Sequence, residues 1–227
     1  TAIKEDVKAA AAAAFGGVAV GSPSAGLPVL LETLASSATQ GGYYLTLTSL
    51  LEVLQRHAPA TAGGPDFAAH VATVLPLLAQ RAETEDEGER AQAAECLGLL
   101  VGIAPEAGLQ ALSSLVASSD ANARWTGVTA VKSCLHSAPA TAALSAAGAI
   151  APYMALLKDE DLVVRLAAMQ TLHALVHSAP DIVRHLFLPT AGTAVSGAAT
   201  GADGSAPAGS VAEIGIMPVL CYEMQVH

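Results

Sequence analysis

The sequence predicts an all-α protein built as an α-solenoid, in which antiparallel helix pairs stack into a right-handed superhelix. Two observations support this prediction. Five prolines spaced 34 to 46 residues apart follow the same helical pattern: Pro23, Pro59, Pro105, Pro139 and Pro180. Fifteen residues before each proline stands a residue that is basic in four of five cases: Lys8, Tyr44, Arg90, Arg124 and Arg165. A constant spacing between two residue types indicates an internal repeat.

Each repeat contains an amphipathic helix that runs from this shared basic position towards the proline. Small or apolar side chains follow it at offsets of three, seven and ten residues, as in Ala93, Leu97 and Leu100. These offsets lie on one face of a helix with 3.6 residues per turn, so we expect them in the core. In the first repeat, the same offsets predict a core face of Ala11, Phe15 and Val18.

Shorter apolar stretches precede the later amphipathic helices, and we expect them to form the partner helices. They are residues 27–34, 71–79, 109–116 and 150–157, and three of them contain a proline, which starts or kinks a helix. The pattern therefore predicts about five units over residues 1–188, the first of which lacks its first helix.

The turn inside the later units has a characteristic pair of residues. Asp86, Asp120 and Asp161 each stand four residues ahead of the shared arginine. An aspartate there can cap the second helix, and the arginine can reach it or the aspartate of the next repeat. Helix pairs of this length with Asp-x-x-x-Arg at the turn are typical of HEAT repeats. The first two units have Lys4 and Gln40 in place of the aspartate.

Composition limits the compartment and the partners. The chain has 227 residues and a formal net charge of −10, which argues against a nucleic-acid partner. Cys96, Cys134 and Cys221 are widely spaced and predict free thiols in a reducing compartment, cytoplasmic or nuclear. Residues 133–157 carry no formal charge, but Pro139 and Pro152 favour two helices over one membrane span. We therefore expect no membrane segment and no signal peptide.

The composition changes near residue 189. Residues 190–211 are almost wholly Ala, Gly, Ser, Thr and Pro, which predicts that residues 189–227 form a low-complexity flexible tail. The last stretch, residues 214–227, is mildly apolar and has no visible place in the array.

Motifs of catalysis are missing from the sequence. It contains neither Gly-x-Ser-x-Gly nor a phosphate-binding Gly-x-x-x-x-Gly-Lys-Ser/Thr loop, so we expect no enzyme, no cofactor and no small-molecule substrate. His173 and His177 share one helix face, and His136 occupies the repeat position of His177, so a three-histidine metal site can be imagined. Solvent-facing histidines are the favoured interpretation.

The remaining candidate is a protein-binding surface. In a HEAT array the second helices line the concave face, and polar side chains gather on the side of these helices predicted to lie opposite the core. That stripe includes Ser49, Glu52 and Arg56. The candidate contact residues are Glu95, Trp125, Thr129, Lys132, His136, Gln170, His173 and His177. Trp125 is either covered by an adjacent repeat or an anchor for a partner.

Several segments, taken together and in order, resemble one family. They are Glu5-Asp6-Val7-Lys8, Leu27-Pro28, Leu47 to Leu54, Glu87-Gly88-Glu89-Arg90, Ala94-Glu95-Cys96-Leu97-Gly98, Thr129-Ala130-Val131-Lys132 and Asp161-Leu162-Val163-Val164-Arg165. From about residue 3 to residue 188 the chain is similar to successive repeats of the CAND proteins, the cullin-associated HEAT-repeat factors.

This resemblance implies a function. CAND proteins are non-enzymatic, bind cullin–RING scaffolds that lack the ubiquitin-like modifier, and drive exchange of substrate receptors, thereby regulating SCF complex assembly. The similar stretch belongs to the C-terminal half of that longer family, so we interpret the chain as a fragment or truncated product. The alternative is a generic HEAT-repeat adaptor scaffold for another protein partner, such as a transport or phosphatase-type adaptor.

Overall fold

The computed structural model describes residues 2–36, 40–56, 67–146 and 149–187, and every regular element in these ranges is a helix. They are α1 (Ala2–Gly21), α2 (Pro23–Ser36), α3 (Gln40–Arg56), α4 (Ala68–Arg81), α5 (Glu87–Ile103), α6 (Pro105–Val116), α7 (Ala121–Cys134), α8 (Ala138–Leu144), α9 (Ala151–Ala155), the 3₁₀ turn η1 (Leu156–Lys158), α10 (Leu162–Ser178) and α11 (Pro180–Phe187). The predicted all-α repeat fold is confirmed.

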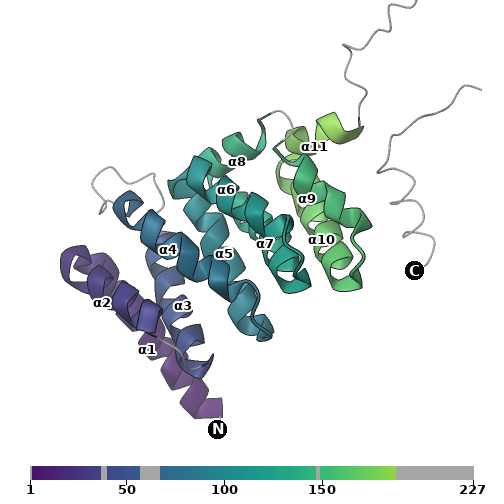
Figure 1. Ribbon diagram of the computed structural model, residues 1–227. Coiled ribbons are helices and arrows are strands. Elements are labelled where there is room, and N and C mark those ends of the chain that lie inside the picture. Colours follow the sequence, from purple (N-terminus) through teal and green to yellow (C-terminus); the bar gives the residue numbers. More distant parts are fainter. Residues whose placement is uncertain (1, 37–39, 57–66, 147–148, 188–227) are drawn as a thin grey trace, which may run out of the picture.

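The helices form two layers (Figure 1). In one layer α1, α3, α5, α7 and α10 each pack against the next, and we call these the second helices. In the other layer α2 contacts α4, α4 contacts α6, and α6 contacts α8 and α9. The short helix α8 was not expected from the sequence, and the predicted partner helix at 150–157 is divided into α9 and η1.

The repeat prolines start helices. Pro23, Pro105 and Pro180 are the first residues of α2, α6 and α11, and Pro139 is the second residue of α8. Proline suits this position because the first N–H groups of a helix have no partner within it. As predicted, the preceding second helix ends near each of these prolines: α1, α5 and α10 end two residues before theirs, and α7 ends five residues before Pro139. Pro59 and residues 188–227, with the predicted tail and Cys221, lie outside the described residues.

The predicted aspartate caps are present. The side chain of Asp86 accepts a hydrogen bond from the Glu89 N–H at 2.9 Å, and that of Asp120 accepts one from the Ala123 N–H at 2.8 Å. Asp161 accepts hydrogen bonds from two N–H groups at the start of α10. These bonds fix where α5, α7 and α10 begin.

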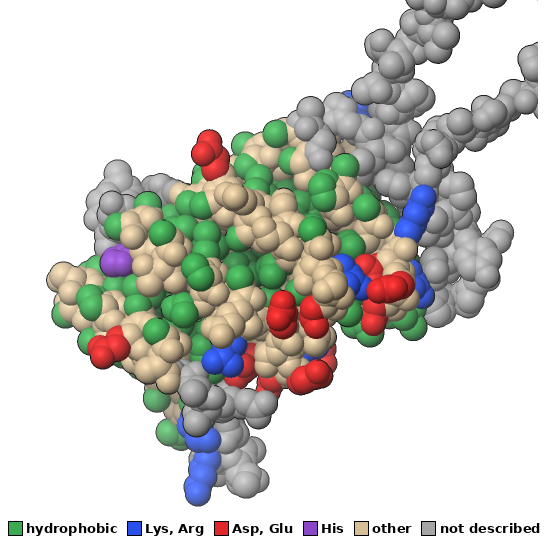
Figure 2. Space-filling model, viewed as in Figure 1, with side chains coloured by type: hydrophobic (Ala, Val, Ile, Leu, Met, Phe, Trp, Pro, Cys, Tyr) green, Lys and Arg blue, Asp and Glu red, His purple; other side chains and the backbone are tan. Residues whose placement is uncertain are grey.

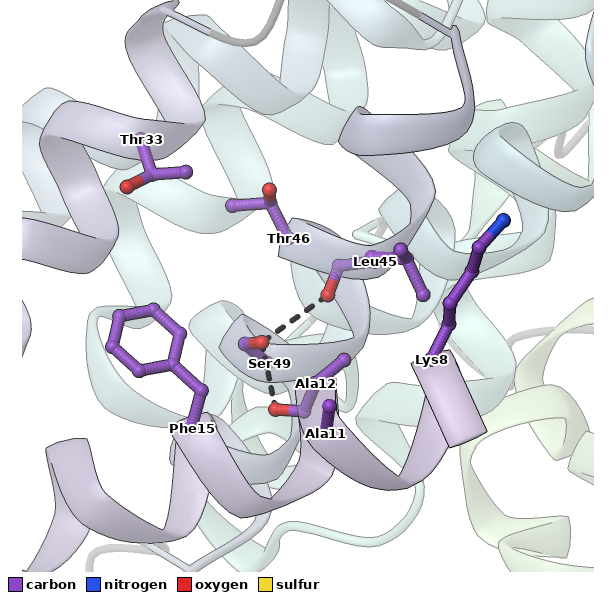
Figure 3. A pocket seen from close by; sticks show the side chains of 8 residues that line it. All are labelled: Lys8, Ala11, Ala12, Phe15, Thr33, Leu45, Thr46 and Ser49. Carbon is purple, nitrogen blue, oxygen red and sulfur yellow. Dashed lines mark hydrogen bonds between the residues drawn. The ribbon is translucent and has the colours of Figure 1, made fainter. Parts of the chain in front are cut away.

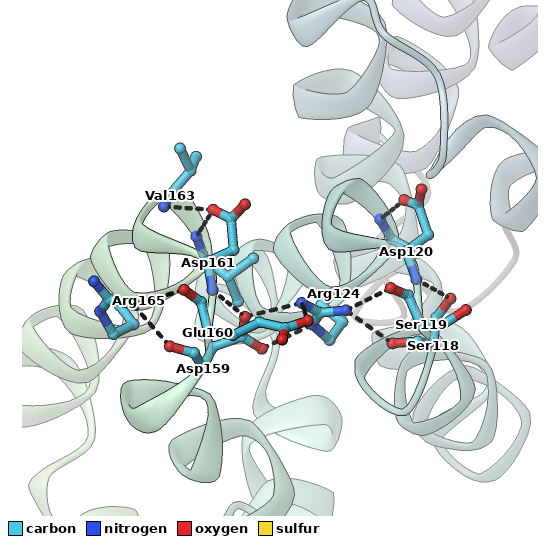
Figure 4. A network of polar contacts seen from close by, with 11 residues as sticks. Ser118, Ser119, Asp120, Arg124, Asp159, Glu160, Asp161, Val163 and Arg165 are labelled. Atoms are coloured by element: carbon cyan, nitrogen blue, oxygen red, sulfur yellow. Dashed lines mark hydrogen bonds and ion pairs between the residues drawn. The ribbon is translucent and has the colours of Figure 1, made fainter.

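The arginines have different partners from those expected. Instead of the cap aspartate, Arg90 donates to the Thr84 carbonyl at 2.6 Å, so it holds the loop before the cap. Arg124 bonds the corresponding loop and also donates twice to Asp159 of the next repeat, at 2.7 and 2.9 Å (Figure 4). Asp159 lies two residues ahead of the cap Asp161, so the prediction named the correct repeat but the wrong carboxylate.

Burial opposes ionisation of Asp159, but hydrogen bonds from Arg124 and from the Asp161 N–H outweigh it and hold the pKa of this carboxyl below its usual value. The Arg124 and Asp159 side chains are only 9% and 7% exposed. This pair joins α7 to the turn before α10.

The second helices approach one another closely through small residues. A Cβ atom on Gly98 of α5 would lie 2.3 Å from the Ala130 carbonyl oxygen of α7. The Thr171 hydroxyl of α10 donates to the Val128 carbonyl of α7 at 3.1 Å. The contact with α7 leaves no room for a larger side chain at Gly98.

The predicted core face is correct for Leu97 and its equivalents in the later repeats but wrong for α1. Ala11 is exposed and Val18 is 63% exposed, whereas Ala12, Gly16 and Ala19 are buried. The reason is the close packing of α3, where the Ser49 hydroxyl donates to the Ala12 carbonyl at 2.7 Å. The buried side of α1 is therefore the side that faces α3, and the predicted offsets are less buried than in the later repeats.

Candidate partner-binding surface

The eight candidate residues lie on three neighbouring second helices. Glu95 is on α5; Trp125, Thr129 and Lys132 are on α7; Gln170, His173 and His177 are on α10; and His136 lies in the turn that follows α7. Because α7 packs between α5 and α10, the array brings the candidates to one region of the second-helix layer.

Trp125 is half-buried and packs against the core. The Arg90 guanidinium of α5 lies over its ring, 5.4 Å from the centroid, which is within the range of a cation–π interaction. An adjacent repeat therefore covers part of the ring. The remaining exposed part is still available to a partner.

The other candidates on α5 and α7 are also half-buried. Glu95 accepts a hydrogen bond from Gln55 of α3 at 3.1 Å, so it links two second helices. The Thr129 hydroxyl is buried and has no hydrogen-bond partner within the described structure. Lys132 is half-buried, and His136 is exposed.

The candidates on α10 are exposed. The rings of His173 and His177 are 4.3 Å apart between centroids and tilted by 52°. His136 does not join them in a metal site, since the described residues contain no group of three His, Cys, Asp or Glu side chains able to hold a metal ion.

Part of the predicted polar stripe lies between helices. Ser49 is buried against α1, so it was wrongly placed on the surface. Glu52 and Arg56 form an ion pair along α3. The offset of Ser49 points towards the preceding second helix, and periodicity within one helix cannot distinguish a neighbouring helix from solvent.

The exposed side of α10 is more apolar than the sequence analysis predicted. Leu162, Val163, Leu166 and Val176 are all large, apolar and at least 42% exposed. They share the exposed side of α10 with Gln170, His173 and His177. The corresponding residues in the α7 repeat are Ala121, Asn122, Trp125 and Leu135, all of them half-buried, so comparison of the repeats would not have marked these residues of α10 as exposed.

A pocket near the N-terminus was also missed. Its volume is about 290 Å³, and it lies between α1 and α3, with Thr33 of α2 at its border (Figure 3). The lining is mostly apolar and includes Phe15 and Leu45, with Lys8 as the charged group. No sequence motif marks this pocket because its walls come from three helices.

Many of the exposed carboxylates lie at the turns between helices. Asp and Glu side chains cluster along one edge of the array in Figure 2, while hydrophobic and neutral side chains cover most of the face in view. The turns contribute exposed carboxylates such as Glu83, Glu85 and Glu160. This distribution matches the capping role of acidic residues at helix starts.

The buried titratable groups offer no activated nucleophile. Cys96 and Cys134 are free and buried, and burial raises the pKa of both thiols, that of Cys134 to about 12. Both are therefore protonated at neutral pH. Burial also raises the pKa of Glu89, whose carboxylate oxygens have no hydrogen-bond partner in the described ranges. No helix in the described part of the chain is long and apolar enough to cross a membrane.

Comparison with known proteins gives three findings. A family model described as stalled ribosome sensor GCN1-like, HEAT repeats, matches residues 27–221. The chain is 36% identical over 184 residues to cullin-associated NEDD8-dissociated protein 1 of Arabidopsis thaliana. It is 35% identical over 183 residues to cullin-associated NEDD8-dissociated protein 2 of Mus musculus. Each match covers 81% of this chain. The expected resemblance to the cullin-associated proteins is confirmed.

The matches cover only a small part of each relative. The chain spans 15% of the length of the Arabidopsis relative and 14% of the mouse relative. Among solved structures, the MAST/Orbit N-terminal domain is similar, with a TM-score of 0.51 and 26% identity over 67% of this chain and 66% of that one. This likeness supports the solenoid fold.

Proposed function

The chain belongs to the HEAT-repeat proteins of the stalled ribosome sensor GCN1-like family, and on that basis we propose that it is a non-enzymatic scaffold that binds other proteins. The observation that carries this proposal is the continuous layer of second helices from α1 to α10, which ends in an exposed, largely uncharged face on α10. Extended surfaces of this kind suit protein partners.

The proposed partner is a cullin–RING scaffold. Its support is the sequence similarity to proteins named as cullin-associated and NEDD8-dissociated, in plant, fly and mouse. We propose that the chain binds the cullin without its ubiquitin-like modifier and acts in SCF complex assembly, in the cytoplasm or nucleus. It needs no cofactor, nucleic acid, membrane or small-molecule substrate for this role.

The proposed contact runs along α7 and α10. Trp125 supplies a large apolar ring held in place by Arg90, and Lys132, His136, Gln170 and His173 supply polar contacts around it. Glu95, Thr129 and His177 border this region. Partly desolvated aromatic residues surrounded by polar groups are typical of the centres of protein interfaces.

A generic HEAT adaptor for a different protein is the second candidate. It is favoured by the family model, whose description names a ribosome sensor rather than a cullin-associated protein. HEAT arrays share core positions irrespective of their partners, so the family match supports the fold more strongly than the partner.

Capture of purified complexes separates these proposals. The immobilised full chain is incubated with unmodified cullin–RING complex, with the NEDD8-modified complex and with ribosomes. We expect retention of the unmodified complex, reduced by His173→Asp on α10 but not by the matched Ser114→Asp on α6, since both residues are exposed. Retention of ribosomes alone would favour the second candidate.

A further inference from the structure

The exposed side of α10 contains a stripe with helical spacing. Leu162, Leu166, Met169, His173 and Val176 follow one another at intervals of three or four residues, so they lie on one face of the helix. Leu162, Leu166 and Val176 are 55%, 42% and 44% exposed. We call these five residues the α10 stripe; none of them is formally charged.

Earlier second helices use the same positions to receive the next second helix. Counted from the shared basic position, the offset of four is Ala12 in α1, Thr48 in α3 and Val128 in α7. Each of these bonds the following helix: Ala12 accepts from Ser49, Thr48 pairs with Gln92, and Val128 accepts from Thr171. In α10 this offset is Met169.

The offsets of eight and eleven behave in the same way. Gly98 at offset eight of α5 adjoins Ala130 of α7, and Gln55 at offset eleven of α3 bonds Glu95 of α5. The corresponding residues of α10 are His173 and Val176. Met169, His173 and Val176 of the α10 stripe therefore lie on the docking face that preceding second helices present to their successors.

We propose that, when no partner is bound, the C-terminal segment 214–227 of this chain docks on the α10 stripe, so that it competes for His173 with the proposed cullin contact. The family match that begins at residue 27 continues to residue 221, so the HEAT pattern extends into this segment. The segment supplies apolar residues for an uncharged stripe, including Val219, Leu220 and Met224, and Glu223 is its single formal charge.

The intervening chain is long enough for this contact. Residues 188–213 can span up to roughly 80 Å when extended, whereas the 17 residues of α10 cover about 25 Å. A tether of this length gives the segment an effective concentration near the millimolar range. The segment on its own chain therefore has an advantage over a second copy, which would have to meet the stripe by diffusion.

Cys221 provides a test on the full chain. His173→Cys places a thiol on the stripe, and Ser114→Cys places one at an exposed position of α6 as the matched control. Cys96 and Cys134 are buried and stay unreactive. Under mild oxidation, we expect the bond from position 173 to Cys221 to form within one chain about tenfold faster than the bond from position 114.

Leu220→Asp should abolish this difference, because it places a charge against the apolar stripe. Equal rates for the two thiols would overturn the proposal. A bond between two chains whose rate rises with protein concentration would also overturn it and would assign the stripe to a second copy. Peptide mapping of the oxidised chain identifies the bonded cysteines in each case.

Discussion

Leu97 has 1% of its surface exposed and lies at the offset of seven residues that the repeat pattern assigns to the core. We expect Leu97→Asp to destabilise the array by several kcal/mol, because a carboxylate would be buried without a partner. Since neighbouring repeats share one core, more than its own repeat should unfold. Ala91→Asp on the exposed side of the same helix should change stability by less than about 1 kcal/mol. Urea melts of both variants measure the difference, and similar midpoints would contradict the assigned register.

The ion pair between Arg124 and Asp159 makes stability depend on pH. The pKa of Asp159 is lowered in the fold, so its contribution is complete above the unfolded pKa of about 4 and is lost as the pH falls through the lower folded value. Asp159→Asn should cost about 3 kcal/mol at pH 7, with the difference from wild type shrinking below about pH 4. Glu160→Gln should have little effect, because Glu160 is largely exposed. Melts between pH 3 and pH 7 test this, and a constant difference over that range would count against the pair.

At the scale of the helix, close packing between second helices depends on glycine. Gly98→Ala would place a methyl group 2.3 Å from the Ala130 carbonyl, so α5 and α7 must move apart. We expect a loss of about 1–3 kcal/mol. Gly17→Ala on α1 meets nothing within 4 Å and should stabilise its helix by up to about 1 kcal/mol. Thermal melts in which both variants shift the same way would show that Gly98 is not a packing position.

Local signals in the sequence were reliable at this scale, whereas signals that depend on neighbours were not. Asp86 and its equivalents could be placed as caps because the cap bonds N–H groups only two or three residues away. The partner of Arg124 could not be identified, since Asp159 belongs to another repeat and no periodicity relates the two. The buried side of α1 was not predicted because it depends on contacts with α3, such as the hydrogen bond from Ser49.

For the whole molecule, the stacking of helix pairs into an array was predictable because the basic residues and prolines recur at the spacing of the repeat. The candidate surface was less predictable from the sequence. The sequence placed its candidates on α5, α7 and α10, but it indicated neither the cover of Arg90 over Trp125 nor the exposure of Leu162 and Leu166. Both depend on which face of a helix meets another repeat, and this depends on packing between repeats.

We propose that this array binds a cullin through α7 and α10, and titration of the unmodified cullin–RING complex against the full chain is the most direct test of this proposal. Trp125→Ala should weaken binding roughly thirtyfold, or about 2 kcal/mol, whereas Lys132→Ala should change it only a few fold. Thermal melts of both variants control for folding, since Trp125 also packs against the core. Equal affinities in folded variants would remove Trp125 from the interface, and no binding by the wild type at tens of micromolar would contradict the claim itself.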